Sequence, residues 1–188
     1  MNQKNHNDGL ILLTGGIETG FIGKPASLEN TTLVTKRLKI LKKLFQDNLY
    51  IELQRHGLKN QIISEKILID AAENFNLPIV ATNDCFFENP QKFNSHQILT
   101  CIDKGLTISS SNRRLLTAEH YLKDSSSMIS LFKDIPEAIE NTIVIAKRCS
   151  YFAKTHKPIL PKYPGLKDIS ENDFLYKIAE EGLKGRIN

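Results

Sequence analysis

Two short apolar segments separated by a helical pattern constrain most strongly how this chain can fold. Residues 49–54 (Leu-Tyr-Ile-Glu-Leu-Gln) alternate as a strand does, so that Glu52 and Gln54 share one face, and residues 78–82 (Pro-Ile-Val-Ala-Thr) predict a second strand that is almost fully apolar. Between them, four apolar residues recur at helical spacing: Ile63, Ile67, Ala71 and Phe75. Strand, helix and strand in this order predict a parallel sheet covered by helices, and therefore an α/β fold, either doubly wound or a barrel.

The segment before this unit predicts one more strand and one more helix. Residues 10–13 read as a buried strand that runs into the turn Thr14-Gly15-Gly16, and two further glycines, Gly20 and Gly23, predict an irregular segment after it. The next helix is indicated by apolar residues at helical spacing: Val34, Leu38, Leu41 and Phe45. Its lysines, Lys36, Lys39 and Lys43, fall on another face. We interpret them as a solvated face, with phosphate contact as the alternative.

After Asp84 the pattern changes to helices. We expect helices over about 94–103 with Gly105 as the stop, over 118–123 and over 136–149, and no strand after residue 90. Residues 158–165 predict a stiff proline-rich connector, and Ser170 with Asp173 predicts the cap of a last helix. Three strands are far fewer than the roughly eight of a closed barrel, so we expect an incomplete α/β fold, as in a fragment.

Composition excludes several classes of protein. The 188 residues are 40% hydrophobic, which is enough for a core, and they contain no run near the roughly 20 apolar residues that span a bilayer. We therefore expect a cytoplasmic protein without membrane contact. Three widely spaced cysteines, Cys85, Cys101 and Cys149, fit a reducing compartment. The formal charge of +4 is too small to establish a nucleic-acid partner.

The glycine-rich stretch from Gly15 to Lys24 does not match a nucleotide-binding motif. A phosphate-binding P-loop needs glycine where Glu18 stands and serine or threonine where Pro25 stands, and the dinucleotide fingerprint needs a G-x-G that does not occur here. A turn that requires positive φ explains the glycines better.

Asp84 follows the strand 78–82 at its carboxyl end, where α/β enzymes place catalytic groups. One carboxylate is not a metal site, and Phe86, two residues on, cannot bind a metal. His56 and His96 are interpreted as structural or surface residues. Cys85 would be a nucleophile only beside a base, and the sequence indicates none.

Seven motifs, taken in order, resemble those of the bacterial DNA polymerase III alpha subunits, the C-family DNA polymerases. They cover nearly the whole chain: LILLTGG (10–16), YIELQRHG (50–57), LPIVATND (77–84), HQILTCI (96–102), FKDIPEAIENT (132–142), IAKRC (145–149) and LPKYP (160–164). Any one of them is weak evidence. Their common order and spacing are specific.

The resemblance implies the fold and the domain organisation. Residues 1–110 would be the C-terminal part of the PHP (polymerase and histidinol phosphatase) domain, 111–157 its helical end, and 158–188 a linker and the first helix of the following polymerase region. The fold would then be a partial PHP-type distorted (β/α) barrel followed by helices, with the barrel incomplete. The histidine-rich first metal motif would precede Met1, and the paired aspartates that hold the polymerase Mg²⁺ ions would lie beyond Asn188.

The resemblance also implies that the PHP metal site is degenerate. Metal-binding PHP domains carry ligands at the positions of Gly16 and Phe86, so Asp84 alone survives as a vestigial ligand. We therefore expect no catalytic residue, no intact metal site and no bound cofactor in this chain. Its role would be structural, with docking of the separate proofreading exonuclease subunit. The full-length protein would use Mg²⁺ and primer-template DNA within the DNA polymerase III holoenzyme.

Three other functions stay open at this point: a free-standing metal-dependent PHP phosphoesterase, the error-prone polymerases of the same family, and a binding module that tethers the exonuclease.

Overall fold

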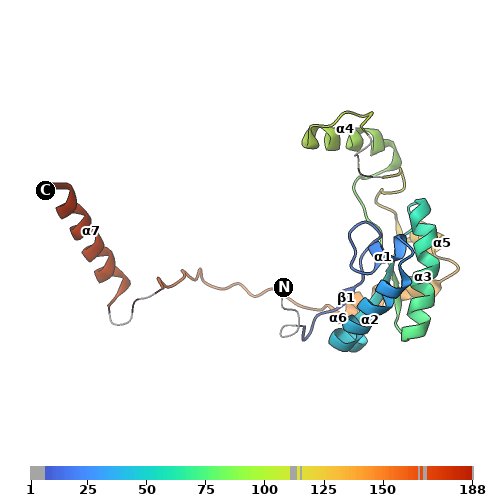
Figure 1. Cartoon of the computed structure of the whole chain (residues 1–188), viewed down its shortest axis with the longest axis horizontal. Coiled ribbons are helices and arrows are strands. Elements are labelled where there is room, and N and C mark those ends of the chain that lie inside the picture. Colours follow the sequence, from blue (N-terminus) through green and yellow to red (C-terminus); the bar gives the residue numbers. More distant parts are fainter. Residues whose placement is uncertain (1–6, 111–113, 115, 165, 167–168, 188) are drawn as a thin grey trace. The chain divides into compact units, whose positions relative to one another are not determined.

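The computed structural model describes residues 7–110, 114, 116–164, 166 and 169–187. The chain divides into two compact units, residues 1–150 and 151–188, and each is described by itself. The first unit contains a parallel sheet and the helices α1 to α6, and the second contains α7 (Figure 1). The α/β class expected from the sequence is confirmed. The identity of the sheet as part of a PHP barrel stays a prediction.

The sheet has three parallel strands in the order β1-β2-β3, namely β1 (Leu12–Leu13), β2 (Leu49–Leu53) and β3 (Ile79–Ala81). In the register, Leu13 lies opposite Tyr50, and Ile51 lies opposite Ile79. The helices α2 (Thr31–Phe45) and α3 (Lys59–Phe75) connect the strands. The first strand is shorter than predicted, because Leu10 is exposed and only Leu12 and Leu13 pair with β2.

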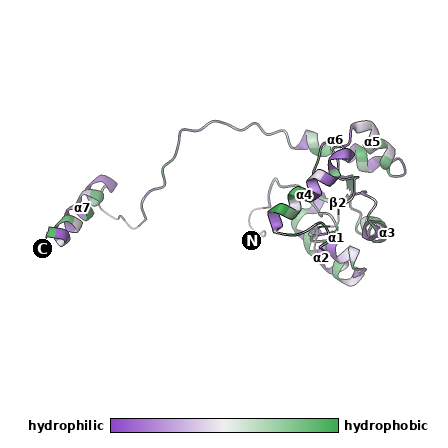
Figure 2. Cartoon of the chain, turned by 90° about the horizontal axis from the view of Figure 1, so that it is seen from above, coloured by the Kyte–Doolittle hydropathy of each residue, from purple (hydrophilic) through white to green (hydrophobic). Residues whose placement is uncertain are grey.

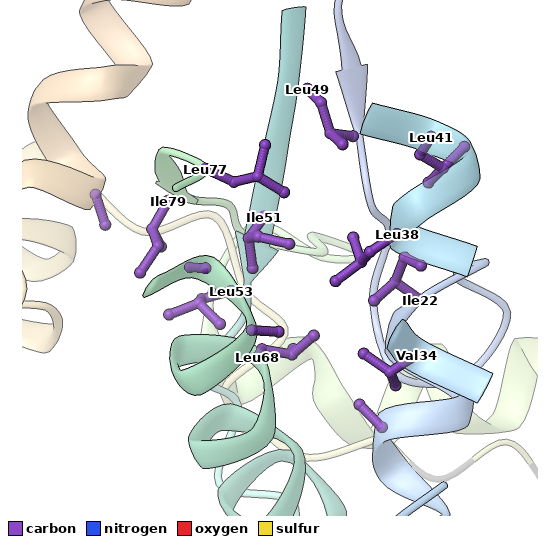
Figure 3. Close-up of a cluster of buried hydrophobic side chains, with 14 of the residues drawn as sticks. Ile22, Val34, Leu38, Leu41, Leu49, Ile51, Leu53, Leu68, Leu77 and Ile79 are labelled. Atoms are coloured by element: carbon purple, nitrogen blue, oxygen red, sulfur yellow. The ribbon is translucent and has the colours of Figure 1, made fainter. Parts of the chain in front are cut away.

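The core lies between the sheet and the helices, and Figure 3 shows its side chains converging from β2, β3, α2 and α3. Leu49, Ile51 and Leu53 of β2 belong to this core, whereas Glu52, one residue out of phase, does not. Burying an aliphatic side chain of this kind contributes about 1.5–3 kcal/mol. The four apolar residues predicted for α2 are all buried, and its three lysines are exposed.

The buried face of α3 agrees with the predicted one only in part. Of the four predicted residues, Ala71 is buried and Ile67 and Phe75 pack against the core, but Ile63 is 42% exposed. The buried residues of the helix are Gln61, Ser64, Leu68, Ala71 and Ala72. The first turns of α3 bury polar residues because Gln61 binds the backbone after β2, where its Oε1 accepts a hydrogen bond from His56 N at 2.7 Å. When some of the buried residues are polar, the spacing of the apolar residues alone does not locate the buried face of a helix correctly.

The glycine-rich segment is a turn followed by a short helix. Gly15 has φ of +80°, as predicted for a turn, and a Cβ atom at Gly20 would lie 2.3 Å from Gly16 O. The expectation that this whole segment is irregular is wrong, because α1 (Gly23–Ser27) forms there. The bare Cα of Gly23 lets α1 approach the backbone of Gly15 and Gly16.

The chain after β3 makes an excursion and returns beside itself. The excursion includes α4 (Phe93–Lys104), which ends at Gly105 with φ of +61°. On return, Tyr121 forms a parallel bridge with Phe87, Phe86 N donates to His120 O at 2.9 Å, and Leu122 N donates to Phe87 O at 2.9 Å. The helix predicted over 118–123 is therefore wrong. Backbone groups of residues 120 and 122 form hydrogen bonds with residues 86 and 87 and not within a helix. The expectation of no strand after residue 90 is confirmed among the described residues, because the contact of Tyr121 with Phe87 is an isolated bridge and not a strand.

Two helices complete the first unit. The short helix α5 (Ser125–Leu131), which the sequence reading missed, is capped by Asp124, whose Oδ1 accepts from Ser127 N at 2.8 Å. The last helix, α6 (Pro136–Arg148), agrees with prediction and packs on β3, where Asn141 Nδ2 donates to Ile79 O at 2.7 Å.

In the second unit, residues 151–163 have no regular structure and are exposed. The helix α7 (Glu171–Ile187), which carries both hydrophilic and hydrophobic residues in Figure 2, begins after the predicted cap, where Asp173 N donates to Ser170 Oγ at 3.2 Å. Across the described residues of both units, none of the helices has the length and apolar character needed to cross a membrane.

Candidate functional site at the carboxyl edge of the sheet

The three parallel strands end at the same edge, and the residues that follow them surround a mostly polar cavity of about 240 Å³. This edge is where open α/β sheets place ligands. The cavity is lined by Gly16, Ile17, Glu18, Thr19, Gln54, Leu58, Gln61, Asp84, Phe86, Arg114 and His120. The structure thus brings together all three residues singled out as former ligand positions: Gly16, Asp84 and Phe86.

Glu52 organises the strand ends beside this cavity. Its Oε2 accepts from Gly15 N at 3.0 Å, and its Oε1 accepts from Thr82 Oγ1 at 2.6 Å and from Gln54 Nε2 at 3.0 Å. The carboxylate therefore ties the ends of all three strands together. The prediction that Glu52 and Gln54 share a face is confirmed.

Arg114 lies among the cavity's acidic groups. Its Nε is 2.6 Å from Glu18 Oε2, its Nη2 is 3.0 Å from Asp84 Oδ2, and its guanidinium carbon lies 4.3 Å from the centre of the Phe86 ring. About a third of each of the three charged side chains is exposed, so solvent screens these ion pairs. Asp84 is therefore already paired with a cationic side chain from a distant part of the chain.

Phe86 and Gly16 offer no metal ligand. The Phe86 ring is half-buried and contacts the imidazoles of His96 and His120, with ring centroids 5.6 Å and 6.0 Å away. A Cβ atom at Gly16 would lie 2.3 Å from Gln54 Oε1, so any side chain there would have to displace Gln54. The Phe86 ring thus lines the cavity and is only partly exposed.

Two histidine rings stack on each other at the cavity, and one of them, His120, lines it. The rings of His56 and His120 are parallel within 13° with centroids 4.0 Å apart, and both residues are buried. His56 Nε2 lies 3.0 Å from Asn83 Oδ1, and its Nδ1 lies 2.9 Å from Gln61 Nε2. Burial, followed by the charge of His120, lowers the pKa of His56 to about 4, and burial also lowers the pKa of His120. Both rings are therefore neutral near pH 7.

The other candidate residues, His56, His96 and Cys85, have structural contacts. His56 is the structural hydrogen-bonding residue that the sequence indicated. His96 lies on α4 against the rings of Phe86 and Phe87, and Cys85 is exposed with its thiol 3.7 Å from Phe87 O. Neither arrangement makes a nucleophile and base pair.

The residues of the cavity do not fit the metal that a PHP domain implies. Within the described part of the chain, no group of three or more His, Cys, Asp or Glu side chains is placed to hold a metal ion. Asp84 is engaged by a guanidinium, and the two imidazoles are engaged with each other and with polar neighbours. We derive no metal-dependent step from this site.

Comparison with known proteins identifies the family. No family model matches the chain. The DNA polymerase III subunit alpha of Caulobacter vibrioides is 38% identical over 182 residues, which is 97% of this chain. The subunits with the same name from Haemophilus influenzae and Escherichia coli K12 are both 36% identical, over 97% and 96% of the chain. The chain belongs to the DNA polymerase III alpha subunit family.

The resemblance predicted from seven motifs is thus confirmed, since the similarity to DNA polymerase III alpha subunits runs over nearly the whole chain. The chain spans 16% of the length of these relatives. The boundaries of the PHP domain and of the following polymerase region stay predictions.

Among the residues that line the pocket of this polymerase III alpha segment, sequence reasoning missed three with titratable side chains: Glu18, Arg114 and His120. Glu18 and Arg114 are 96 residues apart in the chain, and no periodicity links them. Glu18 was weighed only as a misfit in a P-loop. One signal was present in the sequence, because a carboxylate such as Asp84 at a strand end calls for a cationic partner.

Proposed function

We propose that this chain is part of a replicative DNA polymerase that acts as the alpha subunit of the DNA polymerase III holoenzyme in the cytoplasm. The observation that carries the proposal is the similarity over 97% of the chain to proteins of that name. The whole protein adds deoxynucleotides to a primer on a DNA template. The family resemblance assigns the Mg²⁺-binding aspartates of that reaction to the polymerase region, beyond the residues of this chain.

Within this polymerase, the segment acts as a scaffold. The network around Glu52 fixes the strand ends, and Arg114 rather than a metal ligand faces Asp84. A free-standing phosphoesterase would need several ligands converging on a metal ion, and Phe86 and Gly16 supply none. The segment works by supporting neighbouring parts of the subunit and by docking the proofreading exonuclease subunit.

A segment exchange tests the proposal. In the Escherichia coli alpha subunit, the matched segment would be replaced by this chain, and primer extension and retention of the exonuclease subunit would be measured on the purified protein. We expect primer extension and exonuclease binding in the exchanged subunit, and neither in a subunit from which the segment is deleted. A soluble, folded exchange protein that does not extend primers would contradict the proposal.

A further inference from the structure

Arg114 joins three separate parts of the chain at the carboxyl edge of the sheet. Glu18 follows β1, Asp84 follows β3, and Arg114 comes from the segment that returns after α4. The nearby backbone pairing of residues 86 and 87 with residues 120 to 122 brings this returning segment back to the sheet. The arginine is therefore placed to hold the excursion against the strand ends.

The contacts of Arg114 match the chemistry of a guanidinium closely. Its two polar edges reach different carboxylates, at 2.6 Å and 3.0 Å, while its flat face covers a phenyl ring at 4.3 Å. A guanidinium donates in a fixed planar fork and stacks well on aromatic rings, which neither an ammonium group nor a metal ion does. Phe86 and Arg114 are thus complementary to each other, and neither suits a metal centre.

The same two carboxylates are the hard oxygen ligands that Mg²⁺ and Mn²⁺ prefer. A divalent cation between Glu18 and Asp84 would meet the guanidinium there and be repelled by its charge. Without Arg114, the two acids would face one cavity, and no other cationic side chain among the described residues pairs with either of them.

We propose that Arg114 is the resident cation of this pocket: it pairs with Glu18 and Asp84 in place of a divalent metal ion, excludes that ion, and holds the returning segment on the sheet. The inference deepens the proposed function and rests on its claim that the pocket has no metal chemistry. It assigns that property to one side chain outside the motif positions at Gly16 and Phe86.

Thermal unfolding with and without Mn²⁺ tests the inference. It is measured on the wild-type chain, Arg114→Ala and Arg114→Lys. The matched control is Arg37→Ala, because the Arg37 guanidinium also lies 4.3 Å from a phenyl ring, that of Phe21, but donates to a backbone carbonyl and pairs with no carboxylate in the described structure. Mn²⁺ bound by the folded state alone raises the midpoint by mass action.

We expect Arg114→Ala to unfold several degrees below the wild type without metal, and Mn²⁺ to raise its midpoint. We expect Mn²⁺ to leave the midpoints of the wild type, Arg114→Lys and Arg37→Ala unchanged. If Arg114→Ala is unfolded without metal, Mn²⁺ must restore its helical circular dichroism. An Arg114→Ala protein with an unchanged midpoint, or with no response to Mn²⁺, overturns the inference and leaves the proposed function standing. A wild-type chain that binds Mn²⁺ overturns the inference as well, and it also contradicts the claim of the proposed function that this pocket has no metal chemistry.

Discussion

Acid should destabilise the chain through His56, which is buried, neutral and stacked on His120. Its pKa falls from 6.5 to about 4 on folding, first because of burial and then because of the charge of His120. Lys123 also disfavours the charged imidazole, whereas Asn83 and Asp84 favour it. The unfolded chain therefore binds this proton near pH 6.5, and the folded chain binds it only near pH 4.

The sign of the effect follows from this difference. The stability contributed by neutral His56 is fully present above pH 6.5 and is lost as the pH falls from 6.5 through about 4, because only the unfolded state gains the proton in that window. At about 1.36 kcal/mol per unit of pKa, the loss is about 2 kcal/mol by about pH 5 and about 3 kcal/mol below pH 4.

Urea unfolding followed by circular dichroism at a series of pH values measures this loss. His56→Gln removes the titrating group, so we expect a protein that is less stable at pH 7.5 but whose free energy of unfolding depends less on pH between 7 and 4. His156→Gln, in the exposed segment 151–163, should keep the wild-type dependence. An unchanged pH dependence in His56→Gln would refute the reasoning.

Three further outcomes follow from the packing and from the family. Phe86→Ala should lower the free energy of unfolding by about 1–3 kcal/mol, less than Phe132→Ala at a fully buried position, where about 3–5 kcal/mol is expected; chemical denaturation compares the two. Gly20→Ala should destabilise the chain by more than Gly57→Ala, because a Cβ at Gly20 meets Gly16 O at 2.3 Å, whereas one at Gly57 meets only the strain of a φ of +75°; equal losses would contradict this. The isolated chain should not extend a primer, since the family resemblance predicts that the paired aspartates of the polymerase region lie beyond its residues, and incorporation that persists through purification would contradict this.

The sequence predicted those elements whose signals are local. The α2 helix was placed by four apolar residues at regular spacing, α4 by the glycine that ends it, and the parallel sheet by two apolar strands around one helix. For α2 and for the strands β2 and β3, the residues that define the element also bury its core face. Local pattern and tertiary packing then agree, as they do in most well-folded sequences.

The misses arise where partners distant in sequence decide the structure. Residues 118–123 read as a helix, but pairing with Phe87 makes Tyr121 part of a bridge. The buried face of α3 is shifted by Gln61, which serves the backbone of His56 rather than the apolar core. The site was half predicted for the same reason: Asp84 was found at its strand end, while Arg114 arrives from a segment that no periodicity connects to it.

Metal analysis tests the central claim, that this segment of the polymerase III alpha family is a scaffold whose carboxyl-edge pocket holds no metal. The wild-type chain and Asp84→Asn would be incubated with Mn²⁺ or Zn²⁺, separated from free metal by gel filtration and measured by elemental mass spectrometry. Because Asp84 pairs with Arg114 and neither Gly16 nor Phe86 supplies a ligand, the account predicts far less than one metal ion per chain in both proteins. About one ion per wild-type chain, lost in Asp84→Asn, would contradict it.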